Sequence, residues 1–262
     1  MPSLVTEYGI LHYEVFGRGK PLILLHGWLE SWGIWEATME YLGEYFRTYA
    51  LDFWGFGESD LYEGTYQVKD FVQLVQDFMY RLGIRRAPLV GHSMGGTVAL
   101  TMAAQQPERV EKVVVIGSPL VGDSLAWFLK LMGTPVGFWM VRYTPWLIKL
   151  FIRVFGPWIT PDPTWPERVL RDFSQTSVLA FFQSISSLKA VDLRPLLPDI
   201  RQPVLGIYGA QDLIVNPNQW LVLKQHVLHA QIERLFTAGH FPMLETPHAF
   251  HARLYQFLVK EE

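Results

Sequence analysis

The sequence of 262 residues contains no cysteine, so disulfides, a thiolate nucleophile and thiolate metal ligands are all excluded. Basic residues are not in excess, because 22 Lys and Arg face 25 Asp and Glu. The resulting formal net charge of −3 offers no basic face for nucleic acid. No uninterrupted apolar stretch approaches the roughly 20 residues of a membrane-spanning helix, and the N-terminus shows no secretion signal. These absences predict a soluble globular protein, most simply a cytoplasmic one, and leave its oligomeric state open.

Half of the residues are hydrophobic, and they recur in short apolar runs that alternate with helical patterns. A hairpin is predicted over residues 4–16. Strands are predicted at 21–25, 48–53, 89–90, 113–116, 204–208 and 232–236, and helices at 71–82, 94–106, 219–228 and 249–259. Strands that are apolar on both faces and separated by helices indicate a parallel sheet covered on both sides. The hairpin adds antiparallel strands at one edge.

Residues 120–190 interrupt this alternation with aromatic helical segments and repeated prolines. We therefore expect a core domain of residues 1–119 and 191–262, with residues 120–190 inserted as a helical cap over the working edge of the sheet.

The segment GHSMGG, residues 91–96, follows an apolar strand and opens a helix. A serine within G-x-S-x-G at such a junction is typical of a nucleophile elbow. Gly91 and Gly95 allow neighbouring backbones to approach closely, because they lack Cβ. The pattern predicts Ser93 as a nucleophile.

A serine nucleophile needs a base and an acid that orients the base. Asp212 and His240 both come directly after predicted strands, at the strand ends where working groups of parallel sheets collect. Asp192 and Asp199 lack that position, and Asp52 is expected to stabilise a turn. The other histidines fit less well, and those near the C-terminal helices, including His251, are expected to be solvated.

An oxyanion formed at Ser93 needs backbone donors. The amide of Met94 is one expected donor, and Trp28 in the segment LLHGWLES is the other, with Leu29 as its alternative. The indole of Trp28 is expected at the mouth of the pocket.

The motifs LLHGW, DFWGFGES, GHSMGG, YGAQD and AGHFPMLETP, in this order and spacing, resemble the α/β-hydrolase superfamily over nearly the whole chain. The resemblance implies an α/β-hydrolase fold with a mostly parallel eight-stranded sheet, helices on both faces and a helical cap. It is similar to small carboxylesterases and monoacylglycerol-type lipases. It implies a Ser-His-Asp hydrolase of hydrophobic esters that acts through an acyl-enzyme and needs no metal or organic cofactor.

The many aromatic residues of the cap favour an apolar substrate pocket. Its expected lining consists of Leu29, Trp127, Phe128, Trp139, Trp146, Phe182 and Phe241.

Residues 124–160 contain no Asp or Glu, and Lys149 and Arg153 form a basic stripe on an apolar helix. The stripe favours the solvated face of a cap helix, and peripheral contact with an anionic membrane is the alternative.

Four other functions share these motifs: hydrolysis of C–C bonds in meta-cleavage-type diketones, a hydroxynitrile lyase, a cofactor-free perhydrolase, and a ligand receptor that retains the triad. The sequence predicts the ester hydrolase, and leaves the physiological substrate, chain-length preference and stereoselectivity open.

Overall fold

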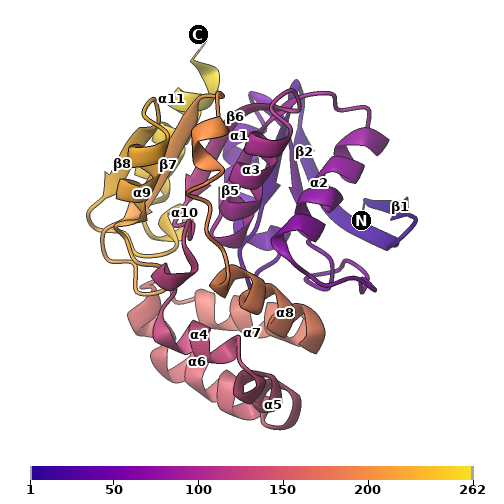
Figure 1. The fold of residues 1–262 in the computed structure, drawn as a ribbon, viewed down its shortest axis with the longest axis vertical. Helices are drawn as coiled ribbons and strands as arrows, with labels where there is room; N and C mark the ends of the chain where they lie inside the picture. The colour runs from indigo at the N-terminus through magenta and orange to yellow at the C-terminus, as the bar shows by residue number, and fades with distance from the viewer. Residues whose placement is uncertain (1, 261–262) are drawn as a thin grey trace.

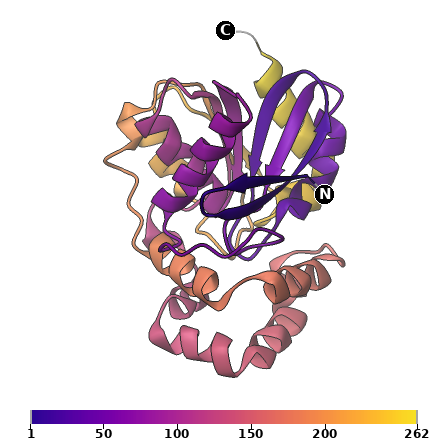
Figure 2. The same ribbon diagram turned by 90° about the vertical axis from the view of Figure 1, so that its right-hand side faces the viewer.

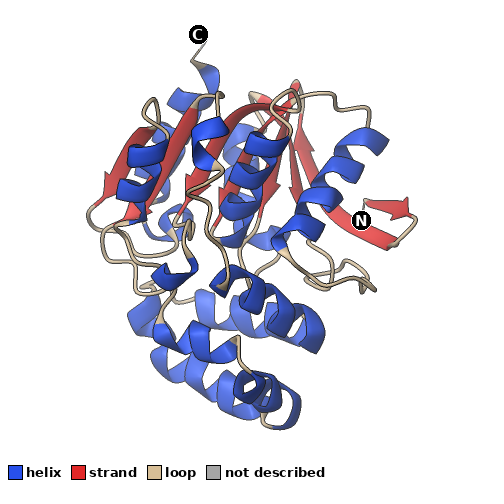
Figure 3. Ribbon diagram, in the orientation of Figure 1, coloured by secondary structure: helices blue, strands red, loops and turns tan. Residues whose placement is uncertain are grey.

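The computed structural model describes residues 2–260 and has a twisted sheet of eight strands with helices on both faces (Figure 3). The strands are β1 (Ser3–Thr6), β2 (Gly9–Gly17), β3 (Lys20–Leu25), β4 (Phe46–Leu51), β5 (Ala87–His92), β6 (Val110–Ile116), β7 (Val204–Gly209) and β8 (Gln231–Leu235). Their order in the sheet is β1-β2-β4-β3-β5-β6-β7-β8. The first two strands pair antiparallel at one edge, and β3 to β8 are parallel, as the sequence predicts.

The central strands are buried on both faces because their alternate side chains enter two separate cores. In β3, Ile23 and Leu25 belong to one core, whereas Leu22 and Leu24 belong to the other. The first core is covered by α2 (Val68–Arg81), α3 (Met94–Gln105) and α9 (Gln219–His226), and the second by α1 (Glu36–Leu42) and α11 (Pro247–Val259). The short α10 (Pro242–Glu245) precedes α11.

Residues 120–190 contain helices and no strand. These helices are α4 (Trp127–Met132), α5 (Pro135–Tyr143), α6 (Pro145–Ile159), α7 (Trp165–Gln175) and α8 (Val178–Lys189). We call α4 to α8 the cap; they lie together beyond one end of the strands (Figures 1 and 2). The chain leaves the sheet at the end of β6, Ile116, and re-enters it at the start of β7, Val204. Between these strands a β-bridge joins Val121 and Asp192, on either side of the cap.

The loops that follow β3, β5, β7 and β8 all leave the carboxyl ends of parallel strands, and the cap covers this end (Figure 1). Ligands of open parallel sheets bind in this place. The topology therefore brings segments that are more than 200 residues apart in sequence to one edge.

Candidate active site

Ser93 lies between β5 and α3, and its backbone is in a conformation that L-residues rarely adopt, with φ 48° and ψ −116°. The surrounding glycines make this turn possible. A Cβ on Gly95 would collide with the carbonyl oxygen of Leu25, and one on Gly91 would collide with the backbone of Gly95. The amide of Ser93 donates to the carbonyl oxygen of Ile116 at 2.8 Å, which fixes the turn against β6.

Asp212 and His240 form a buried pair in which Nδ1 of the imidazole lies 2.7 Å from Oδ2 of the carboxylate. The other carboxylate oxygen accepts the backbone N–H groups of Ile214 and Val215, at 2.8 and 2.9 Å. An ionised carboxylate only accepts hydrogen bonds, so Nδ1 of His240 carries the proton. Nε2 is left free to accept a proton from another group.

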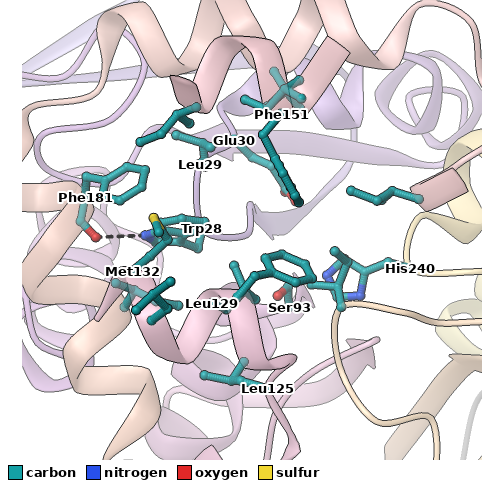
Figure 4. Close-up of a pocket in the computed structure, with 18 of the residues that line it drawn as sticks. Trp28, Leu29, Glu30, Ser93, Leu125, Leu129, Met132, Phe151, Phe181 and His240 are labelled. Atoms are coloured by element: carbon teal, nitrogen blue, oxygen red, sulfur yellow. Dashed lines mark hydrogen bonds between the residues drawn. The ribbon is translucent and has the colours of Figure 1, made fainter. Parts of the chain in front are cut away.

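Ser93 and His240 line the same cavity, which has a volume of about 330 Å³ and lies between the cap and the sheet (Figure 4). Gly117 lies beside the pair, where a Cβ would come within 3.1 Å of Nδ1 of His240. The three residues expected to form the triad thus converge at one edge, with a hydroxyl and an imidazole exposed to one space.

The two residues expected to donate to an oxyanion follow β5 and β3, which are neighbours in the sheet. Met94 is the first residue of α3, so its amide has no acceptor within the helix. Trp28 follows β3, and its indole Nε1 donates to the carbonyl oxygen of Phe181 in the cap at 3.0 Å. The two rings lie 4.5 Å apart. The indole therefore attaches this loop to the cap, and the amide of Trp28 is a separate group.

A second buried acid–histidine pair, Glu30 and His92, was not predicted from the sequence. Nδ1 of His92 lies 2.9 Å from Oε1 of Glu30, and its Nε2 lies 2.8 Å from the carbonyl oxygen of His240. Oε2 of Glu30 also accepts the amide of Gly27 at 2.6 Å. This pair links the loops that carry Trp28, Ser93 and His240.

Both nitrogens of His92 face acceptors, so the ring is an imidazolium. Burial opposes the charge, but Glu30 outweighs it and raises the pKa of His92. Burial likewise opposes ionisation of Glu30, and His92 outweighs it and lowers the pKa of that carboxyl. In the sequence, Glu30 is an acid three residues after the His26-Gly27 turn, and His92 directly precedes Ser93. Neither feature predicts that the two side chains meet.

Asp52 stabilises a turn, as expected from the sequence. Its carboxylate accepts the amides of Trp32 at 2.7 Å and Glu58 at 2.9 Å, and it contacts Nδ1 of His12 at 2.8 Å. Burial opposes the charge on His12, but Asp52 dominates and raises the pKa of His12. The bond to Trp32 holds the far end of the loop that carries Trp28.

A family model described as alpha/beta hydrolase fold matches residues 20–140 and 147–247, which is most of the chain. The chain belongs to the α/β-hydrolase family. Within it, the fold predicted from the sequence is confirmed: a mostly parallel eight-stranded sheet with helices on both faces.

Curated α/β-hydrolase relatives match nearly the full chain. A pimeloyl-[acyl-carrier protein] methyl ester esterase of Nitrosomonas europaea is 28% identical over 275 residues, covering 92% of this chain and 96% of its own. A 3-oxoadipate enol-lactonase 2 of Acinetobacter baylyi is 28% identical over 255 residues, covering 95% of this chain and 92% of its own. Among solved structures, an enol-lactonase of Burkholderia xenovorans superposes with a TM-score of 0.85 at 23% identity, covering 99% of this chain and 100% of its own. The last comparison supports the fold alone.

The cavity of this α/β-hydrolase has a different lining from the one predicted. Trp28, Leu29, Trp127, Phe128 and Phe241 line it as expected. Most of the remaining lining is aliphatic and was missed, because single leucines and isoleucines in apolar helices carry no functional signal. These residues include Leu125, Leu129, Met132, Ile148, Ile152 and Ile185.

The prediction that Trp139, Trp146 and Phe182 line the pocket was wrong. Trp139 and Trp146 lie on outward faces of α5 and α6 and are 59% and 61% exposed. Phe182 packs against the ring of Phe138, whereas its neighbour Phe181 lines the cavity. Both faces of these helices are apolar, so the sequence did not show which face points inward.

The cavity is almost free of charge. Among the described residues, Glu30 is the only acidic side chain in the lining, and it is paired with His92. Within residues 2–260, no Lys or Arg lines the cavity, and no three His, Asp or Glu side chains are grouped to hold a metal ion. The site therefore offers a hydroxyl, an imidazole and apolar walls.

Proposed function

We propose that this protein is a serine-dependent carboxylic-ester hydrolase for small hydrophobic esters. One arrangement carries the proposal: Ser93 and His240 line one apolar cavity, and Nδ1 of His240 is held by Asp212. The names of the curated relatives, an esterase and a lactonase, support ester hydrolysis in general.

In the proposed reaction, Nε2 of His240 takes the hydroxyl proton as Ser93 attacks the ester carbonyl carbon. Asp212 stabilises the imidazolium that forms. The amides of Trp28 and Met94 donate to the oxyanion. His240 then protonates the leaving alcohol, and water attacks the acyl group on Ser93 by the same route to release the acid.

The apolar lining favours an acyl or aromatic ester over a charged substrate. A C–C hydrolase of a dienoate would have to bind a substrate carboxylate, and no Lys or Arg lines the cavity within the described residues. A buried carboxylate without a partner is costly, so the ester hydrolase is the better-supported function.

The test combines a fluorophosphonate probe with turnover of p-nitrophenyl butyrate. We expect the probe to label Ser93 and we expect Ser93→Ala to lower kcat by at least about a thousandfold. Ser118→Ala is the matched control, because this buried serine does not line the cavity and should stay active. Labelling elsewhere, turnover of a dienoate but not of esters, or a single slow turnover with a change in the cap would contradict the proposal.

A further inference from the structure

The outer face of α6 is apolar although it points away from the rest of the protein. Trp146, Leu150, Val154 and Trp158 recur every four residues, so they form one row along the helix. They are 61%, 51%, 51% and 69% exposed, and none of them lines the cavity. The row is about 18 Å long at 1.5 Å per residue. We call these four residues the α6 row.

The opposite face of α6 is apolar as well, with Ile148 and Ile152 buried over the cavity. A helix that is apolar on both faces is normally enclosed on both. The preceding helix, α5, also exposes aromatic side chains: Trp139 and Tyr143 stack with ring centroids 4.5 Å apart and are 59% and 60% exposed. Exposed apolar surface of this extent usually contacts a partner.

Basic side chains flank the α6 row, and α5 and α6 carry no acidic side chain. Lys149 and Arg153 are exposed and four residues apart on α6, and neither forms an ion pair within residues 2–260. Arg142 is exposed on the preceding helix. The chain has no Asp or Glu between Asp123 and Asp162.

We propose that the α6 row, with Lys149 and Arg153, docks this protein on an anionic lipid surface. Leu and Val side chains enter the acyl region, and Trp side chains occupy the boundary between acyl chains and headgroups. Lys and Arg lie along an apolar helix with their charges directed to anionic headgroups. Within residues 2–260 no helix is long and apolar enough to cross a bilayer, so the contact is peripheral.

A second copy of this chain fits the surface less well. In a twofold dimer the same surface meets itself, which would bring Lys149 and Arg153 of both copies together, and neither α5 nor α6 contributes a carboxylate to the contact. An acidic protein would satisfy the basic residues but gives no reason for two exposed tryptophans at the ends of the row.

The experiment measures binding to vesicles by flotation, using the full chain with Ser93→Ala so that no lipid is hydrolysed. Vesicles of equal parts phosphatidylcholine and phosphatidylglycerol are compared with phosphatidylcholine alone. We expect binding to the anionic vesicles, and we expect W146S/W158S and K149E/R153E each to weaken it at least about tenfold. Added salt should weaken binding of the parent protein more than that of K149E/R153E.

Matched controls carry comparable changes on the surface of the core domain, away from the cap. They are Y80S/L228S and K69E/R85E, which also replace exposed residues. These variants should bind as the parent does. With Ser93 intact, W146S/W158S should hydrolyse a soluble ester at the same rate as the wild-type protein, which would show that the fold is retained. The binding test itself does not depend on ester hydrolysis.

Failure of the parent protein to float with anionic vesicles would overturn the proposal, as would equal loss of binding in the core controls. Conversion of a dimer to a monomer by W146S/W158S, without vesicle binding, would assign the surface to a second copy. Binding to polyglutamate that depends on Lys149 and Arg153 but not on the tryptophans would assign it to an acidic protein. Either result would also overturn the proposal.

Discussion

Two histidines with rings 4.7 Å apart are held in different proton arrangements by their partners. His240 donates from Nδ1 to Asp212, whereas His92 donates from both nitrogens, to Glu30 and to the backbone of His240. The difference comes from the acceptors that face each ring. His92 thereby positions the backbone of His240 without facing the cavity itself.

Replacing Glu30 by Gln should leave His92 buried without a counter-ion. Breaking a buried ion pair from one side costs roughly 3–5 kcal/mol, and we expect a loss of about 3 kcal/mol in the free energy of unfolding, measured with urea at pH 6. We also expect a lower kcat with little change in KM, because Glu30 holds the loop that carries Trp28. Glu233→Gln is the control; its pair with Arg253 is half-buried and still open to solvent, and should contribute less than about 1 kcal/mol.

The Glu30–His92 pair also predicts a pH dependence. The pKa of His92 is raised above 6.5, so its contribution to stability is full below pH 6.5 and is lost as pH rises through the raised value. The pKa of Glu30 is lowered from 4.5, so its contribution is lost as pH falls through the lowered value. The difference in stability between wild type and Glu30→Gln should thus be largest between pH 4.5 and 6.5. A difference that grows above pH 7 would contradict this assignment.

Among the elements, the contact between α1 and α11 contains a buried histidine. Nε2 of His251 lies 3.1 Å from Oγ1 of Thr38, and its ring stacks on Tyr41 at 4.9 Å. Burial, with a smaller effect from His248, lowers the pKa of His251 to about 4. The unfolded chain therefore binds a proton before the folded one does, and stability is lost as pH falls from 6.5 towards 4.

His251→Gln should reduce this sensitivity to acid, because Gln can keep a hydrogen bond to Thr38 and does not titrate. The measurement is urea unfolding at pH 7.5 and pH 5, where the variant should lose less stability than wild type. His248→Gln, an exposed change on the same helix, should behave nearly as wild type. Equal losses in wild type and His251→Gln would show that His251 does not cause the acid sensitivity.

The same elements show which features the sequence could predict. The strands were placed correctly because each is an apolar run followed by a polar turn. The same local pattern led to Ser93, Asp212 and His240, which the fold brings to one edge of the sheet. His251 was expected to be solvated, and this was wrong because it packs on α1, a helix of seven residues that the sequence did not reveal. α2 begins at Val68 rather than at 71, because Gln67 and Asp70 form a capping box before the first strong apolar repeat. Contacts between distant segments, such as Glu30 with His92, left no local pattern.

At the scale of the whole molecule, the cap and the sheet enclose the cavity and are tied by polar contacts at its rim. The indole of Trp28 bonds to Phe181, and Oγ of Ser31 donates to the buried carboxylate of Asp172 at 3.1 Å. Burial raises the pKa of Asp172. The cap supplies most of the apolar walls of the cavity, and the core supplies Ser93 and His240.

Met132→Trp should restrict this cavity to esters with shorter acyl chains. Met132 and His240 lie at opposite sides of the cavity in Figure 4, so a larger side chain at 132 fills the space far from the reacting group. We expect kcat/KM for p-nitrophenyl octanoate to fall roughly tenfold more than for the butyrate ester, since methylene groups contribute binding only where they fit. Val136→Trp, on the exposed side of α5, is the control and should leave the ratio unchanged. A uniform loss with both esters would indicate a folding defect instead.

The β-bridge between Val121 and Asp192 gives the insertion between them a common point of departure and return. Because the two ends of the insertion meet at this bridge, the length and composition of the cap can differ without a change in the strands. Substitutions within the cap can therefore change most of the cavity walls while the core loops that carry Ser93, Asp212 and His240 stay in place.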